Sequence, residues 1–206
     1  MKVMLVNGSH HEKGCTYTAL AEVAKALNAN GIETEIYQLS GKNIEGCKGC
    51  WACKKAKKCV FDDGTVNEFV AKAAEFDGFV FGSPVYYASA AGALVSFMDR
   101  VFYSGGKNLA FKPAAAVVSC RRAGASTTFD VINKYFTINN MPIVGSNYWN
   151  EIHGNTAEEA AQDAEGLQTM RMLGNNMAWL LKCIALGKEA GIAPETEKKI
   201  WTNFIR

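Results

Sequence analysis

The sequence predicts an α/β fold in which a doubly wound, five-stranded parallel sheet of order 2-1-3-4-5 is covered by helices on both faces. Short apolar, β-prone runs alternate with stretches of helical periodicity five times along the chain. Parallel neighbours require right-handed crossovers, and these place helices on both faces of the sheet. Loops of unusual composition follow the first, third and fourth strands, whose carboxyl ends meet where the winding reverses. We therefore expect a ligand at that edge of the sheet.

The first strand, residues 2–7, is an apolar run typical of a strand that is buried on both faces. The loop after it leads directly into a helical pattern, and a helix N-terminus offers free backbone N–H groups and a partial positive charge. The hydroxyls of Ser9, Thr16, Tyr17 and Thr18 add donors in the same stretch. The spacing matches neither the dinucleotide G-x-G-x-x-G motif nor the P-loop. The loop therefore favours a phosphomonoester that is bound but not hydrolysed, and a plain connecting loop is the alternative.

The remaining elements follow from the periodicity of the apolar residues. The later strands are expected at residues 34–39, 79–81 and 114–118, with a fifth that begins at 142–144. The helices are expected after the opening loop, from Thr65, around Leu94, from Phe129 and from Thr156, and both threonines have capping-box spacing. The last helix is long and has a Met- and Leu-rich stripe typical of a core or a subunit interface. Cys183 is expected to be buried on this helix, as a lone cysteine usually is.

The composition indicates one globular domain. The chain has 206 residues, of which 20% are charged and 49% hydrophobic, and its formal net charge is +2. We expect one domain over residues 1–206, with an insert at 40–64 and a C-terminal helical extension at 150–206. The small net charge gives no support for binding to nucleic acid or to a membrane surface. No signal-peptide pattern opens the sequence, so we expect a cytoplasmic protein whose thiols stay reduced.

The loop after the third strand suits the flat ring of a ligand. Pro84 fixes one φ angle and Gly92 relaxes another, so the backbone between them can follow a defined, irregular path. Such a path presents N–H and C=O groups to the edge of a heterocycle, while Tyr86 or Tyr87 packs against its face. Two surface tyrosines on an ordinary loop are the alternative. Together with a phosphate loop at the same edge of the sheet, the pattern indicates a mononucleotide.

The insert carries four cysteines in a C-x2-C-x2-C-x5-C pattern, within a lysine-rich stretch: Cys47, Cys50, Cys53 and Cys59. The first three can reach different corners of one iron–sulfur cube, and the last is near enough to be the fourth ligand. The lysines would offset the negative charge of the thiolates. The alternatives are a zinc site, whose ligands usually form two distant pairs, a redox disulfide, or a structural loop without metal.

Several motifs resemble those of the flavodoxin-like NAD(P)H-dependent FMN reductases. These motifs are Gly8-Ser9-His10-His11-Glu12-Lys13-Gly14-Cys15-Thr16, Gly82-Ser83-Pro84-Val85-Tyr86-Tyr87 and Phe97-Met98-Asp99-Arg100. Arg121-Arg122-Ala123-Gly124, Tyr148-Trp149-Asn150 and the cysteine spacing resemble the iron–sulfur flavoprotein branch of that family. The resemblance spans nearly the whole chain and implies a flavodoxin-like fold.

The resemblance also implies residue roles. Ser9, Thr16 and Thr18 would hold the FMN phosphate, with Cys15 lining the loop. The isoalloxazine ring would contact Pro84, Val85, Tyr86, Tyr87, Ala88 and Ser89. The loop with Ser119, Arg121, Arg122 and Gly124 would close over the ring or the incoming reductant, and the four insert cysteines would ligate a [4Fe-4S] cluster. Relatives often carry Pro-Arg where this chain has His10-His11, so His11 would supply only a partial charge to the phosphate.

The function implied is that of an FMN-dependent oxidoreductase that takes electrons from NAD(P)H and reduces a small acceptor such as a quinone, a flavin or an aromatic compound. An iron–sulfur flavoprotein that carries electrons between protein partners is the alternative, and a non-catalytic mononucleotide-binding module is a third. No catalytic side chain is expected, because the cofactor carries the redox chemistry. The aromatic segment 148–152 and the Met-rich last helix favour a homodimer, or a tetramer built from dimers.

Overall fold

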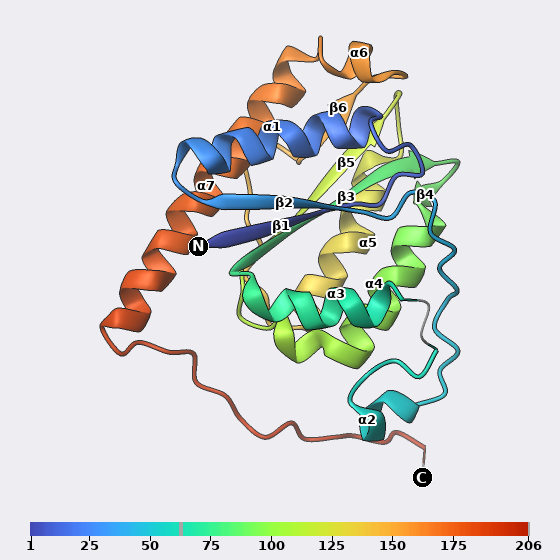
Figure 1. The fold of residues 1–206 in the computed structure, drawn as a ribbon, viewed down its shortest axis with the longest axis vertical. Coiled ribbons are helices and arrows are strands. Elements are labelled where there is room, and N and C mark those ends of the chain that lie inside the picture. Colours follow the sequence, from blue (N-terminus) through green and yellow to red (C-terminus); the bar gives the residue numbers. More distant parts are fainter. Residues whose placement is uncertain (62–63, 206) are drawn as a thin grey trace.

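A parallel sheet forms the centre of the molecule (Figure 1). The computed structural model describes residues 1–61 and 64–205, so residues 62–63 of the expected insert and residue 206 of the expected domain lie outside the described residues. The parallel strands are β1 (Lys2–Asn7), β2 (Glu33–Gln38), β3 (Gly78–Tyr86), β5 (Ala114–Cys120) and β6 (Glu151–His153). They pair in the order β2-β1-β3-β5-β6, and β4 (Ser89–Ala90) pairs antiparallel with the end of β3.

The α/β class and the parallel sheet are as predicted, and the strand order agrees with the predicted 2-1-3-4-5 only in part. The orders differ because the chain contains an additional short strand, β4, which pairs only with β3 and shifts the numbers of the later strands. The position predicted for the fifth strand, residues 142–144, is wrong. Ile143 makes an isolated bridge to Ala114, and the strand that pairs with β5 is β6. Pro142 has no N–H to donate, which weakens a ladder at this position.

Helices cover both faces of the sheet (Figure 1). One face is covered by α1 (Cys15–Ala29) and α7 (Ala164–Glu189), and the other by α3 (Val66–Lys72), α4 (Gly92–Gly105) and α5 (Ala125–Ile138). The short helical segments are α2 (Ala52–Ala56), η1 (Ala73–Glu75), η2 (Gly106–Asn108) and α6 (Ala157–Ala160). No helix of the described residues is long and apolar enough to span a membrane.

Two apolar cores form because successive strand residues point to opposite faces of the sheet. Met4 and Val6 of β1 pack with α3, α4 and α5 in a core rich in phenylalanine. Val3 and Leu5 pack in the other core with α1 and α7. Within the first core, the rings of Phe69 and Phe97 meet edge to face, with centroids 4.9 Å apart. Both cores position the carboxyl ends of the strands, where the functional site lies.

The capping-box threonines start helices, but not quite as predicted. Thr65 precedes α3 without a side-chain capping bond. Thr156 caps α6, since its hydroxyl accepts a hydrogen bond from the Glu159 N–H at 3.3 Å. However, α6 ends at Ala160, and the long helix α7 starts separately, with the Asp163 carboxylate accepting from the Gly166 N–H at 2.9 Å.

The prediction that Cys183 is buried is wrong, because this thiol is exposed. The buried stripe of α7 includes Met170, Leu173, Met177 and Leu181. A residue two positions after Leu181 lies about 200° further round a helix of 3.6 residues per turn, on the opposite side. Helix α7 ends at Glu189, and residues 192–205 form no helix or strand, so the expected helical extension does not reach the end of the chain.

Candidate functional site

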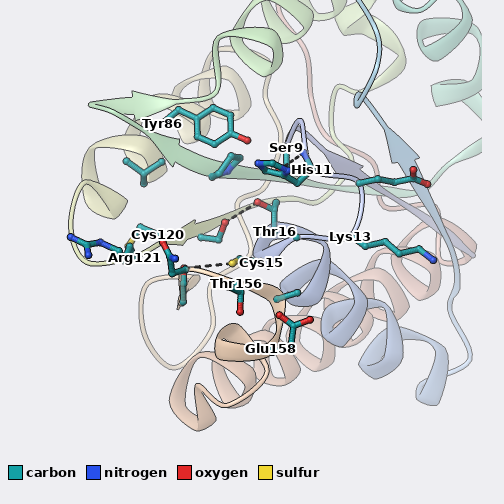
Figure 2. A pocket seen from close by; sticks show the side chains of 18 residues that line it. Ser9, His11, Lys13, Cys15, Thr16, Tyr86, Cys120, Arg121, Thr156 and Glu158 are labelled. Atoms are coloured by element: carbon teal, nitrogen blue, oxygen red, sulfur yellow. Dashed lines mark hydrogen bonds between the residues drawn. The ribbon is translucent and has the colours of Figure 1, made fainter.

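A cavity of about 650 Å³ lies at the carboxyl ends of β1, β3 and β5 (Figure 2). This is the edge where the winding of the sheet reverses and where ligands bind in open α/β sheets. Four segments line it: the loop after β1, the end of β3, the end of β5, and the segment from β6 into α6. Figure 2 shows Tyr86 on one side of the cavity, with Thr156 and Glu158 on the opposite side.

The loop after β1 is held by the buried side chain of Asn7. Its Oδ1 accepts from the Ser9 N–H at 3.1 Å, while its Nδ2 donates to the Glu12 carbonyl at 3.1 Å and to Gln38 Oε1 at 2.8 Å. The Ser9 hydroxyl in turn accepts from the His11 N–H at 3.1 Å. These bonds fix the path of the loop before any ligand is present. Asn7 was not expected at the site, because the only sign of its role in the sequence is a polar residue at the end of an apolar strand.

Helix α1 starts at the cavity with Gly14 as its N-cap and no side-chain capping bond. The N–H groups of a first helical turn have no partner within the helix, so this end retains donors for an anion. Thr16 is almost completely buried, and its hydroxyl lies 2.8 Å from the Ser119 hydroxyl at the end of β5. Gly82 makes this close packing possible, because a Cβ there would lie 2.9 Å from Thr16 Cγ2.

Two thiols line the same cavity. Cys15 Sγ donates to the Gly154 carbonyl at 3.5 Å, and Cys120 is buried at the end of β5. Burial raises the pKa of both thiols above the ordinary value of 9.0, and nearby glutamates raise the pKa further. Both cysteines are therefore neutral near pH 7 and do not provide a thiolate nucleophile.

The segment expected to follow an irregular path is instead a β-hairpin. Val85 pairs with Ala90 and Tyr86 with Ser89, so Tyr87 and Ala88 form the turn. Tyr87 has a positive φ of 57° and a fully exposed side chain. Of this hairpin, only residues of the β3 arm, Pro84 to Tyr86, line the cavity.

The structure brings nine of the residues expected at the flavin site to the cavity, and leaves the others outside it. Those that line it are Ser9, His11, Cys15, Thr16, Pro84, Val85, Tyr86, Ser119 and Arg121. Those that do not are Tyr17, Thr18, Tyr87, Ala88, Ser89, Arg122 and Gly124. The Thr18 hydroxyl donates back to the Gly14 carbonyl at 3.3 Å, within its own helix. Gly124 supports the cavity wall from behind, because a Cβ there would lie 2.8 Å from Val85 Cγ1.

Further lining residues were missed by the sequence analysis. They are Glu12, Lys13, Gly14, Cys120, Gly154, Asn155, Thr156, Ala157 and Glu158. The last five follow β6 and reach the cavity because β6 pairs with β5. Their only sequence signal was the capping box, which indicated a helix start but not its place beside the first loop.

The four cysteines of the insert line a second, smaller cavity of about 20 Å³, next to α2 and α4. All four are free thiols, and their neighbours in the cavity wall include Lys48, Trp51, Phe61 and Arg100. Among the described residues, no three histidine, cysteine or acidic side chains are arranged to hold a metal ion. The structure thus brings the expected ligands to one place without giving them the geometry of a metal site.

Comparison with known proteins extends these findings. A family model described as NADPH-dependent FMN reductase matches residues 1–156. An iron–sulfur flavoprotein of Methanocaldococcus jannaschii is 35% identical over 196 residues, which cover 89% of this chain and 99% of that protein.

Solved structures share the fold at low sequence identity. RosB with bound 8-demethyl-8-formylriboflavin-5'-phosphate matches with a TM-score of 0.70 and 15% identity, over 100% of this chain and 92% of that chain. A flavodoxin from the domain Archaea matches with a TM-score of 0.61 and 15% identity, over 88% of this chain and 99% of that chain. The fold is therefore flavodoxin-like. By its match over residues 1–156, this chain belongs to the NADPH-dependent FMN reductase family, whose cofactor is FMN.

Proposed function

We propose that the protein is an FMN-dependent oxidoreductase that takes electrons from NAD(P)H and reduces a small acceptor such as a quinone, a flavin or an aromatic compound. The main support is the cavity of about 650 Å³ at the switch point of the sheet, in a chain that belongs to an FMN reductase family. A volume of this size is in the range of pockets that take cofactor-sized ligands.

The residues present fit FMN. The uncapped N-terminus of α1, with the buried Ser9 and Thr16 beside it, suits a phosphate group. Pro84, Val85 and Tyr86 would flank the ring, and Tyr86 is 41% exposed, which leaves its aromatic face available for stacking. We propose the nine cavity-lining residues of the sequence prediction as FMN contacts.

FMN held at this cavity would supply the redox chemistry, namely hydride acceptance from a nicotinamide and transfer of electrons to the acceptor. The chain has the tasks of binding, orienting and controlling access. Arg121 and Lys13 bring positive charge to the cavity, where they can attract the anionic groups of a dinucleotide. Cys15 and Cys120 also line the cavity, and burial raises the pKa of both thiols, so they stay protonated near pH 7.

A second function, electron transfer through an iron–sulfur cluster, is favoured by the cysteine cavity. Four free thiols around one cavity are the donor set of a [4Fe-4S] cluster, and the M. jannaschii relative is named as an iron–sulfur flavoprotein. Cys47, Cys50, Cys53 and Cys59 would be the ligands, after the loop rearranges around the metal. The alternatives are a zinc ion, a redox disulfide and a structural loop without metal. Binding of a cluster requires that these thiols stay reduced, and the cytoplasm keeps thiols in that state.

The two cavities have no lining residue in common, and α2 lies well away from the end of α1 that lines the larger one (Figure 1). The distance for electron transfer between a cluster and a flavin of the same copy would therefore be long. We propose that the protein forms homodimers or tetramers in which the cluster serves the flavin of another copy, and that the cluster can pass single electrons to a redox protein partner.

Two variants, compared with the wild type, test this proposal in protein purified without oxygen. The wild type is expected to contain FMN, iron and acid-labile sulfide. Cys50→Ala should lose iron and sulfide but keep FMN and its reduction by NADPH or NADH. Cys183→Ala is the matched control, because this thiol is exposed and lies outside the cysteine cavity. If the wild type contains no iron, the plain oxidoreductase function is the correct one; if Cys50→Ala keeps its full iron content, the ligand set is wrong.

A further inference from the structure

The cysteine cavity contains a buried cation that belongs to α4. Arg100 is 3% exposed and lines the cavity together with all four cysteines. A buried guanidinium is stable only when its donors find acceptors. Among the described residues, three acceptors of the Arg100 side chain lie on the cysteine loop, a name we use for residues 45–61.

Three donors of Arg100 reach three separate points of the cysteine loop. Its Nε donates to Cys59 Sγ at 3.4 Å, and its Nη1 donates to the Glu45 carbonyl at 3.3 Å. Its Nη2 donates to the Phe61 carbonyl. Glu45 lies two residues before the first cysteine of the pattern and Phe61 two residues after the last. One planar side chain therefore joins both ends of the loop and contacts a thiol between them.

Cys59 is held from a second direction by α3. Its N–H donates to Asn67 Oδ1 at 3.0 Å, and its carbonyl accepts from Asn67 Nδ2 at 2.9 Å. The side chain of Asn67 therefore fixes the backbone of Cys59, while Arg100 fixes its sulfur. The other loop cysteines lack a comparable pair of contacts in the described structure, where Cys53 Sγ lies 3.9 Å from the Tyr103 carbonyl. Cys59 is the anchored member of the set.

We propose that Arg100 is a positioning residue for the cysteine loop: it closes the loop onto α4, holds Cys59, and raises the reduction potential of a cluster bound there. The first part stands on the hydrogen bonds alone, whereas the effect on the potential rests on the proposed cluster function. Hydrogen bonds to the ligand sulfurs and nearby positive charge are two of the factors that set the potential of a cluster. A positive charge favours the reduced, more negative form.

The planar guanidinium of Arg100 offers several hydrogen-bond donors in a fixed geometry, in addition to its positive charge. Lysine carries the same charge, but its compact ammonium cannot reproduce three donors in one plane. Arg100→Lys should therefore lose loop closure while keeping part of the electrostatic effect. Arg100→Gln should lose both. Lys25→Gln is the matched control for charge, because Lys25 is exposed on α1 and lies outside the cysteine cavity.

The test uses two measurements on these three variants. In iron-free protein, hydrogen exchange of backbone amides in residues 45–61 should become at least tenfold faster in Arg100→Gln and Arg100→Lys, and stay unchanged in Lys25→Gln. In anaerobically purified or reconstituted protein, the cluster potential of Arg100→Gln should become more negative by the equivalent of a tenfold change in the reduction equilibrium, about 59 mV for one electron. Arg100→Lys should fall between this value and the wild type, and Lys25→Gln should match the wild type.

The outcomes separate this inference from the function on which it rests. If the wild type binds no iron, the cluster proposal fails, and the exchange rates alone decide whether Arg100 closes the loop. Unchanged exchange in both Arg100 variants would overturn loop closure, and an unchanged potential in Arg100→Gln, or an equal shift in Lys25→Gln, would overturn the effect on the cluster. If Arg100→Gln does not fold, the exchange rates and the cluster potential of Arg100→Lys decide, and loss of the cluster from both Arg100 variants would overturn the proposal that Arg100 only positions the loop and tunes the potential.

Discussion

The hydroxyl oxygens of Thr16 and Ser119 lie 2.8 Å apart, and their hydrogen bond joins the first turn of α1 to the end of β5 at the edge of the larger cavity. Thr16 is 1% exposed and Ser119 is 3% exposed. The bond therefore links a helix start and a strand end that are far apart in the sequence, at the place where a phosphate is expected. It is the most direct sign that these loops form one site.

Thr16→Val should weaken FMN binding and destabilise the fold. Loss of a hydrogen bond to a charged phosphate corresponds to about 1.5–3 kcal/mol, or roughly tenfold to a hundredfold in the FMN dissociation constant. The free energy of unfolding should fall by about 1–3 kcal/mol, because Ser119 is left as a buried hydroxyl without its partner. Fluorescence titration with FMN and urea denaturation measure the two effects.

Thr18→Val is the matched control, since the Thr18 hydroxyl bonds to Gly14 of its own helix and does not line the cavity. FMN affinity should stay within about twofold of the wild type, well under the 1.4 kcal/mol that a tenfold change requires. Adding Ser119→Ala to Thr16→Val should recover part of the lost stability, because no unpaired hydroxyl remains. Equal FMN affinities in the Thr16 and Thr18 variants would show that the phosphate binds elsewhere.

Gly124→Ala should destabilise the wall of the cavity. Gly124 has a φ of +89°, and an added Cβ would lie 2.8 Å from Val85 Cγ1. The backbone strain alone costs about 1–2 kcal/mol of unfolding free energy. Val85→Ala in the same chain should remove the overlap but not the strain. Gly145→Ala should be neutral within about 0.5 kcal/mol, because Gly145 has open space around it. A neutral Gly124→Ala would contradict the described packing.

Thiol labelling should separate the cysteines by their surroundings. The raised pKa of Cys15 and Cys120 means less reactive thiolate at a given pH, so alkylation of both should be slow at pH 7 and accelerate above the ordinary value of 9.0. Cys47, Cys50 and Cys183 are exposed and should label first. Mass spectrometry after a timed iodoacetamide pulse gives the rates. Rapid labelling of Cys120 at pH 7 would contradict its burial.

The raised pKa values of Cys15 and Cys120 also determine whether the stability of the fold rises or falls with pH. A thiol whose pKa is higher in the folded state stabilises the fold fully below its unfolded pKa, and this contribution is lost as the pH rises through the folded pKa. Above about pH 9, the unfolding free energy of the wild type should therefore fall relative to that of Cys120→Ala. Below about pH 8, the difference between the two should be constant. A constant difference up to pH 10 would mean that the Cys120 pKa is not raised.

Oligomerisation is expected from large aromatic side chains that the single chain leaves in solvent. Tyr148, Trp149 and Trp179 are 57%, 52% and 68% exposed. Light scattering should give the mass of a dimer or tetramer, and dilution to monomers should slow cluster reduction more than flavin reduction. A monomer at all concentrations would contradict this expectation.

The sequence was sufficient where the signal is local, and insufficient where tertiary pairing decides. The strand and loop at residues 2–16 could be predicted because an apolar run, a glycine-rich turn and a helical period follow one another directly. The contribution of Thr156 and its neighbours could not, because it depends on β6 pairing with β5. The error at Cys183 has a similar origin: the helical period was right, but the face that meets the sheet is set by Met170 and Leu173 rather than by the type of residue at 183.

The most direct test of the account is an anaerobic titration of the FMN-loaded protein with NADPH, and separately with NADH, followed by the flavin absorbance. The account predicts stoichiometric bleaching of bound FMN by at least one of the two nucleotides and its reoxidation by an added quinone, with Thr16→Val requiring more FMN to reach the same loading. A protein that does not bind FMN, or whose bound FMN is reduced by neither nucleotide, would contradict it.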